Sequence, residues 1–133
     1  MFEHSVQLRW SDPDTYGHVN HARALSLIED ARLAMAGGAP GVAPGRQPDV
    51  ILARLEVDYL RQLHYRVGEV LPVHSWVTRI GTKSFTVRHE LLQDGQVAIR
   101  ADAVIVLFDI ASNASRALTD EEREYWGRYL VAG

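Results

Sequence analysis

The residues best suited to chemistry lie together in segment 12–21, which reads Asp-Pro-Asp-Thr-Tyr-Gly-His-Val-Asn-His and runs into an apolar stretch. The segment holds two carboxylates, Asp12 and Asp14, and two imidazoles, His18 and His21. Proteins use these groups for general acid–base catalysis, nucleophilic attack and metal binding. The segment is therefore the candidate functional site, or else a turn that is merely rich in polar residues.

Three explanations without catalysis have to be weighed. In a plain turn, Asp12 and Asp14 would bond to their own backbone, Gly17 would supply a positive φ, and Asn20 would cap a helix. A transition-metal site has suitable ligand types here, but the segment contains no helical His-x-x-x-His pair. A calcium loop would place Arg23 at its twelfth position, where a bidentate Glu is required, so we exclude it.

Acyl hydrolysis is the catalytic explanation. It needs a carboxylate that attacks the acyl carbon or activates water, and it needs donors for the developing oxyanion. The first N–H groups of a helix have no partner within the helix and carry the positive end of its dipole. A loop that brings Asp14 beside a helix beginning near His21 would supply both requirements. The chain has no Gly-x-Ser-x-Gly motif, so a serine hydrolase of that type is not supported.

Composition limits the other possibilities. The chain has 133 residues, of which 47% are hydrophobic and 23% charged, which predicts one domain over residues 1–133. The net charge of -3 gives no support for nucleic-acid binding. The absence of cysteine excludes disulfides and thiolate chemistry and fits a reducing cytoplasm. No signal peptide and no apolar run of about 20 residues is present, so we expect a cytoplasmic protein without membrane contact.

The hydrophobic pattern predicts a long helix. Apolar residues at helical spacing extend over residues 21–36, Asn20 is a good N-cap, and Gly37-Gly38 ends the helix. A short strand is predicted before it at 4–10, and an irregular loop rich in Gly and Pro after it at 37–48.

From residue 49 onward the pattern changes to the period of two that is typical of strands. The expected strands cover about 49–59, 69–80, 84–93 and 96–109, with a turn at 81–83, a hairpin at Asp94-Gly95 and a short C-terminal helix capped by Thr119. One long helix against one five-stranded antiparallel sheet is an α+β two-layer domain. Such a sheet leaves its edge strands open, so we expect a dimer.

The sequence resembles a known family. Residues 9–20, Arg-Trp-Ser-Asp-Pro-Asp-Thr-Tyr-Gly-His-Val-Asn, followed by Glu29-Asp30-Ala31-Arg32, are similar to the signature of hotdog-fold acyl-CoA thioesterases of the 4-hydroxybenzoyl-CoA thioesterase superfamily. The resemblance implies a five-stranded antiparallel sheet wrapped around a long central helix. It also implies hydrolysis of an acyl-CoA, or of an acyl-carrier-protein thioester, without a cofactor or metal.

The same resemblance assigns the catalytic loop. Asp14 would be the nucleophile or general base, and the backbone N–H of His21 would polarise the thioester carbonyl. Gly17 and His18 would complete this loop, and Asn20 would contact the substrate. The family's active site lies at a dimer interface, often within a tetramer.

Further substrate contacts follow from the resemblance. Basic residues near the turn between the later strands would meet the CoA phosphates; the nearest candidates in this chain are Arg79, Lys83 and Arg88, together with the polar Ser84, and Arg61 is further off. Tyr59 is expected to line the pocket. Related sequences often carry an aromatic residue where Ala24 stands, so we hypothesise a roomier acyl pocket. Glu29 is expected to pair with Arg32 on the helix rather than to act in catalysis.

Two other functions are compatible with the same fold. One is a module that binds or senses acyl-CoA without cleaving it. The other is a hotdog dehydratase or hydratase, which would need a paired catalytic histidine, and His18 and His21 are available for that role.

Overall fold

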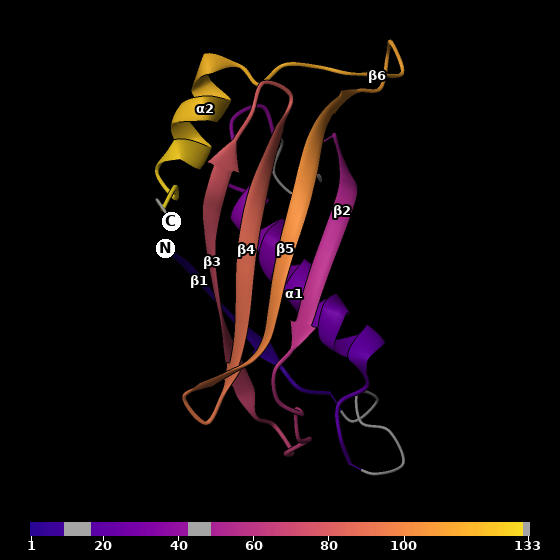
Figure 1. Cartoon of the computed structure of the whole chain (residues 1–133), viewed down its shortest axis with the longest axis vertical. Helices are drawn as coiled ribbons and strands as arrows, with labels where there is room; N and C mark the ends of the chain where they lie inside the picture. Colours follow the sequence, from indigo (N-terminus) through magenta and orange to yellow (C-terminus); the bar gives the residue numbers. More distant parts are fainter. Residues whose placement is uncertain (10–16, 43–48, 132–133) are drawn as a thin grey trace.

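The computed structural model describes residues 1–9, 17–42 and 49–131. It has the α+β architecture predicted from the sequence, with one long helix against one antiparallel sheet (Figure 1). The elements in chain order are β1 (Phe2–Gln7), α1 (His21–Ala36), β2 (Val50–Tyr59), β3 (Val70–Ile80), β4 (Ser84–Gln93), β5 (Gln96–Asp109), β6 (Ala114–Ser115) and α2 (Asp120–Gly127).

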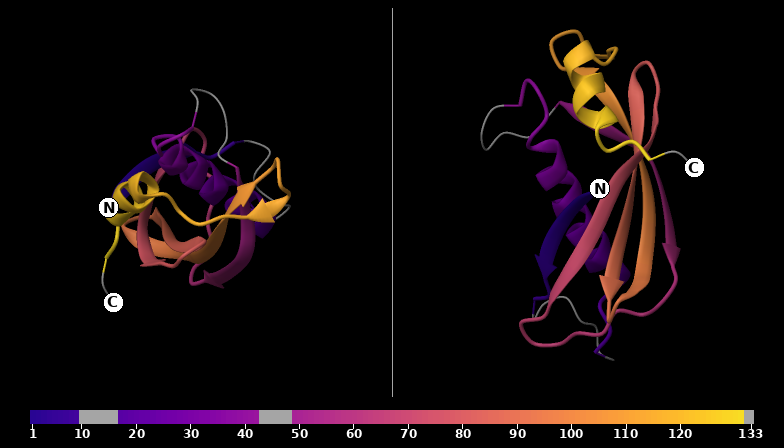
Figure 2. Two further views of the ribbon diagram at one scale, coloured as in Figure 1. Left: turned by 90° about the horizontal axis from the view of Figure 1, so that it is seen from above. Right: turned by 90° about the vertical axis from the view of Figure 1, so that its left-hand side faces the viewer.

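The main sheet has the strand order β1-β3-β4-β5-β2, and every neighbouring pair is antiparallel. It curls around α1, as the view from above shows (Figure 2). β1 and β2 are the two edges of this path, and β6 pairs only with β5. The expectation of a sheet wrapped around a central helix is confirmed. No helix in the described part of the chain is long and apolar enough to span a membrane.

Local sequence explains where α1 begins and ends. The side chain of Asn20 accepts a hydrogen bond from the backbone N–H of Ala22 at 2.9 Å, and Gly37 donates its N–H to the carbonyl of Leu33 at 2.9 Å. These are the predicted bounds. Half of the buried side chains of α1 are alanines, which lets the sheet approach the helix closely at those positions; the buried residues are Ala24, Leu27, Ile28, Ala31, Met35 and Ala36.

The core lies along α1 and consists of two clusters. One cluster surrounds the first half of the helix, and a second surrounds its end. In the second cluster Trp126 of α2 stacks on Phe85 of β4 with ring centroids 4.2 Å apart. Thr119 and Glu122 form a capping box that starts α2, as the sequence predicted for Thr119. The short C-terminal helix therefore covers the far end of the core.

Two boundaries differ from the prediction. The first strand is Phe2–Gln7 rather than 4–10, because its extent is set by pairing with β3 from Ser75 to Val70. The short strand β6 was not predicted, since a two-residue strand exists only through its partner in β5.

The strand directions determine which residues can meet. Neighbouring strands of the sheet run in opposite directions, and the start of α1, the end of β2 and the β4–β5 hairpin lie at one end of the molecule (Figure 1). Asp94 and Gly95 form this hairpin with φ of 55° and 74°, as the Asp-Gly pair predicted. The β3–β4 turn and α2 lie at the opposite end (Figure 1).

Candidate active site

A cavity of about 350 Å³ opens beside the first turn of α1. Its walls are residues 18–21 and Ala24, residues 59–63 at and after the end of β2, and Ile99 of β5. The structure therefore brings together six residues singled out from the sequence, namely His18, Asn20, His21, Ala24, Tyr59 and Arg61. Gly17 directly precedes this group in the chain.

The first turn of α1 presents an open hydrogen-bond donor to this cavity. Asn20 occupies the N–H of Ala22, but the N–H of His21 has no acceptor among the residues that the structure describes. The first turn also contains no acidic side chain that would offset the positive end of the helix dipole. The site can therefore stabilise negative charge on a ligand oxygen.

Tyr59 reaches the helix start from the sheet. Its ring lies 6.2 Å from the imidazole of His21 in an edge-to-face arrangement, and the tyrosine is 51% exposed. The last residue of β2 thus meets the first residue of α1. This contact fixes one wall of the cavity at the open edge of the sheet.

The end of the loop is held by strand-like pairing. The N–H of Val19 donates to the carbonyl of Leu63 at 2.8 Å, and the N–H of Tyr65 donates to that of Gly17 at 3.0 Å. Gly17 has a φ of 76°, which agrees with the expected left-handed turn. The ring of His18 lies 5.1 Å from that of His64. These contacts fix the approach of the loop to α1.

Gln93, at the end of β4, anchors this pairing to the sheet. Its buried amide accepts from the N–H of His64 at 3.0 Å and donates to the carbonyl of the same residue at 2.9 Å. Sequence reasoning did not single out this glutamine. In the sequence, only its position just before the Asp94-Gly95 hairpin indicates a place near the site, because that hairpin lies at the same end of the molecule as the start of α1 (Figure 1).

Asp12 and Asp14 lie outside the described residues. Among residues 1–9, 17–42 and 49–131, no three His, Asp or Glu side chains are arranged to hold a metal ion. The alternative of a metal site needs Asp12 and Asp14 as ligands, and both lie outside the described residues.

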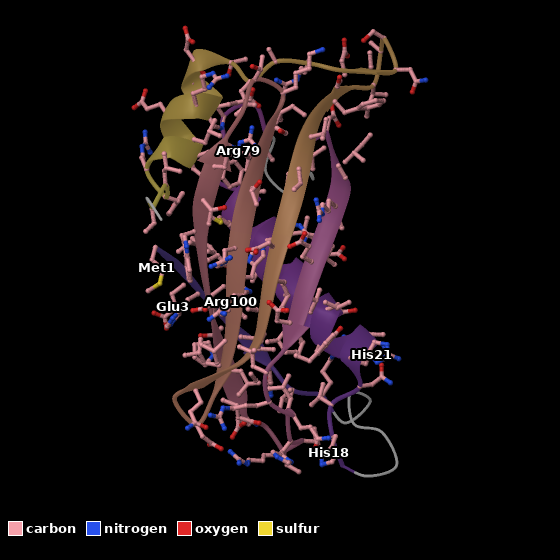
Figure 3. All side chains as sticks on the ribbon, in the orientation of Figure 1. Met1, Glu3, His18, His21, Arg79 and Arg100 are labelled. Carbon is pink, nitrogen blue, oxygen red and sulfur yellow. The ribbon has the colours of Figure 1, made fainter. Side chains whose placement is uncertain are left out.

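The predicted CoA contacts are not at this cavity within one chain. Arg79 lies near the end of β3, and Lys83 and Ser84 belong to the β3–β4 turn, at the opposite end from His18 and His21 (Figure 3). Arg88 donates two hydrogen bonds to Asp102, of 2.7 and 2.9 Å, and this carboxylate raises its pKa.

Arg61 is the cation that the structure places beside the helix start. It lines the cavity described above and also an adjoining hollow of about 390 Å³, which extends to Asp94 and Gln96. Its backbone N–H donates to the carbonyl of Ala98 at 3.0 Å. No carboxylate in the described part of the chain lies within 4.0 Å of its guanidinium. The sequence analysis had treated this residue as the more distant candidate.

The predicted pair between Glu29 and Arg32 is not formed. Glu29 is exposed, whereas Arg32 is partly buried and lines a different cavity, near the end of α1. Burial lowers the pKa of Arg32, and the charge of Glu29 offsets this only in part. The spacing i, i+3 permits an ion pair, but in this structure no nitrogen of Arg32 lies within 4.0 Å of the Glu29 carboxylate.

Comparison with known proteins agrees with this architecture. Residues 8–124 match the family model of the thioesterase-like superfamily. The chain is 26% identical over 125 residues to the uncharacterized protein YsmA of Bacillus subtilis, a match that covers 92% of this chain and 83% of the relative.

Two solved structures show the same fold. A predicted thioesterase from Bacillus stearothermophilus has a TM-score of 0.88 at 26% identity, covering 99% of this chain and 98% of that one. A thioesterase from Thermus thermophilus, in complex with coenzyme A and Zn, has a TM-score of 0.77 at 28% identity, covering 92% and 94%. The hotdog fold is thereby confirmed, and the chain belongs to the thioesterase-like superfamily.

Proposed function

We propose that this protein hydrolyses an acyl-CoA thioester to the free acid and CoA, with Asp14 as the carboxylate and the backbone N–H of His21 as the donor to the carbonyl oxygen. The observation that carries the proposal is the N–H of His21, which has no acceptor among the described residues and lies at a helix start that opens into a cavity of about 350 Å³. Membership of the thioesterase-like superfamily supports thioester hydrolysis as the reaction class.

The chemistry needs few groups. Either Asp14 attacks the thioester carbon and forms an anhydride that water then hydrolyses, or it removes a proton from an attacking water molecule. In both routes negative charge develops on the carbonyl oxygen, and the His21 N–H donates to it. The C–S bond then breaks, and CoA leaves as a thiolate that takes up a proton. A single donor of this kind is worth about 10²–10³ in turnover in other hydrolases.

Arg61 is our candidate for the CoA phosphates, in preference to the predicted Arg79, Lys83, Ser84 and Arg88. It lies at the junction of the two hollows beside the helix start and has no ion-pair partner in the described ranges. The similar Thermus thioesterase binds coenzyme A, which supports this ligand class. An acyl-carrier-protein thioester presents the same acyl-pantetheine group, with one phosphodiester in place of the CoA phosphates, so both carriers belong in the assay.

A homodimer through β2 is the second part of the proposal. β2 is an edge strand, and it and the residue after it expose large apolar side chains: Ile51, Leu52, Tyr59 and Leu60 are 45%, 42%, 51% and 49% exposed. An edge with open backbone groups and apolar side chains favours pairing with a second strand. Because Tyr59 and Leu60 also line the cavity, such a partner would border the site. Light scattering after size exclusion should give twice the mass of the chain, and Leu52→Lys should lower it.

The deciding experiment is thiol release from a panel of acyl-CoA thioesters by the wild-type protein, Asp14→Asn and Asp12→Asn. We expect Asp14→Asn to lower turnover by at least about 10²-fold while its melting temperature is kept. Asp12→Asn is the matched control in the same loop and should retain most of the activity. Binding of acyl-CoA without thiol release would identify a non-catalytic module, and near-normal turnover by Asp14→Asn would disprove the role of Asp14.

A further inference from the structure

A second cavity lies near the end of α1, away from the proposed active site. Between His21 and Arg32 the helix rises roughly 16 Å at 1.5 Å per residue. The cavity measures about 120 Å³ and is enclosed mainly by apolar side chains from α1, β4, β5 and α2. Those that define its shape are Leu33, Ala36, Phe85, Ile105, Leu107 and Trp126.

The size of this cavity limits its ligand. An apolar protein cavity of about 150 Å³ is large enough to hold benzene. The present cavity, at about 120 Å³, is smaller than that, so its ligand can be no larger than a single ring or a chain of a few carbons. The stacked pair of Phe85 and Trp126 forms a flat aromatic wall on one side.

Arg32 gives this apolar cavity an unbalanced charge. Its side chain is partly buried, and no carboxylate in the described part of the chain lies within 4.0 Å of it. Residues 43–48, which follow the cavity wall in sequence, read Ala-Pro-Gly-Arg-Gln-Pro and contain no acid. A buried cation without a partner is costly, and an anionic ligand would remove that cost.

Two other charged residues of the wall, Arg116 and Glu122, are paired with each other. Arg116 donates to both carboxylate oxygens of Glu122, at 2.7 and 2.9 Å. Asp49 acts electrostatically on Arg116, whose pKa is raised mainly by Glu122. Towards the sheet, the charge of Arg32 reaches His89, which is fully buried and supplies no negative charge. Arg32 is thus the group in this wall that is left to meet an anion.

We propose that this cavity binds a small carboxylic acid, with its ring or short chain against Phe85 and Trp126 and its carboxylate on the guanidinium of Arg32. A carboxylic acid is also the product class of the proposed hydrolysis, so a role as a product site rests on that function. The binding itself does not depend on it.

The test is calorimetric titration of the full chain with benzoate and with benzamide, its neutral counterpart of the same shape. We expect benzoate to bind saturably and at least about ten-fold more tightly than benzamide, as a charge-assisted hydrogen bond provides. Arg32→Met should abolish this preference while it keeps the aliphatic volume of the side chain. Without ligand, Arg32→Met should also raise the melting temperature, because it removes an unpaired charge.

Three further variants locate the site. Ala36→Leu should fill the cavity and weaken both ligands. Arg128→Met, which alters an exposed arginine of α2, should change neither affinity. Arg61→Met reports on the cavity at the helix start and should leave benzoate binding intact.

The proposal is overturned if no saturable binding occurs, if benzamide binds as tightly as benzoate, or if Arg61→Met rather than Arg32→Met removes the preference. Should Arg32→Met fail to fold, the benzoate–benzamide comparison on the wild-type protein and on Ala36→Leu still decides. Benzoate contains no thioester, so failure here leaves the thiol-release assay unaffected, and the reverse also holds.

Discussion

The hydroxyl of Ser75 lies 2.7 Å from Nδ1 of His89, and the two residues face each other across β3 and β4 with both side chains fully buried. Nε2 of His89 is also buried and has no partner among the described residues. Burial, and then the positive charge of Arg32, lowers the pKa of His89 to about 3. The folded protein therefore holds this imidazole neutral until the pH falls to about 3.

This pair predicts a loss of stability in mild acid. The unfolded chain binds a proton at His89 near its ordinary pKa of about 6.5, whereas the folded chain does not until about pH 3. The contribution of His89 is therefore complete above pH 6.5 and is lost as the pH falls towards 3. Between pH 7 and pH 5 the free energy of unfolding should fall by about 2 kcal/mol through this group alone.

Urea unfolding at the two pH values measures this effect. His89→Gln cannot titrate, so its stability should fall less between pH 7 and pH 5 than that of the wild type. His4→Gln, which removes a histidine from the edge strand β1, is the matched control. An equal fall in all three proteins would show that His89 does not cause the pH dependence.

Arg61→Gln should raise KM for acyl-CoA about five-fold or more and leave kcat nearly unchanged, because an exposed phosphate contact serves binding in the ground state and the transition state alike. Arg128→Gln, at the other end of the molecule, is the control. Steady-state thiol release gives both constants. A fall in kcat at constant KM would place Arg61 in the chemical step instead.

Ala24→Leu should shift the preference towards shorter acyl groups. Ala24 is 1% exposed and belongs both to the core and to the cavity wall, so added carbon atoms must enter the cavity or strain the core. The strain should cost about 1–3 kcal/mol of stability. Ala22→Leu, on the exposed side of the same turn, is the control. Rates measured over a chain-length series would contradict the hypothesis if the two variants gave the same profile.

Asn20→Ala should lower the melting temperature by about 3–5 °C, since loss of a helix cap costs about 1 kcal/mol. Asn20→Asp keeps an acceptor for the Ala22 N–H and should melt close to the wild type. Its negative charge beside the His21 N–H should nevertheless lower thiol release, because it competes for the positive end of α1. If both variants melted alike, the hydrogen bond seen at 2.9 Å would not stabilise the helix.

The fold could be predicted well wherever local residues set a boundary. Asn20 and Gly37 define α1, and Asp94-Gly95 fixes the register of β4 against β5, so these elements have the predicted limits. Where the end of a strand depends on its partner strand, the local sequence indicates the boundary less well. β1 ends at Gln7 because β3 ends its pairing at Val70, and no local pattern near residue 7 shows that.

Of the residues expected at the site, those within 18–24 lie together at the start of α1, whereas Lys83 lies in the β3–β4 turn and Arg88 in β4. Counting strand directions would have helped, since alternation places the β3–β4 turn at the end of α1 and residues 59–63 at its start. Arg61 could have been chosen on that ground. The ion pair predicted for Glu29 failed because spacing alone does not show which side of a helix is buried.

The double hydrogen bond of Gln93 to the backbone of His64 imitates a rung of a β-ladder with a single side chain. His64 in turn pairs with His18, so Gln93 connects the β4–β5 hairpin to the residues just before α1. The register of β4 against β5 therefore determines where residues 17–19 lie. Changing this one amide would therefore move residues 17–19 at the entrance to the cavity without any change in those residues themselves.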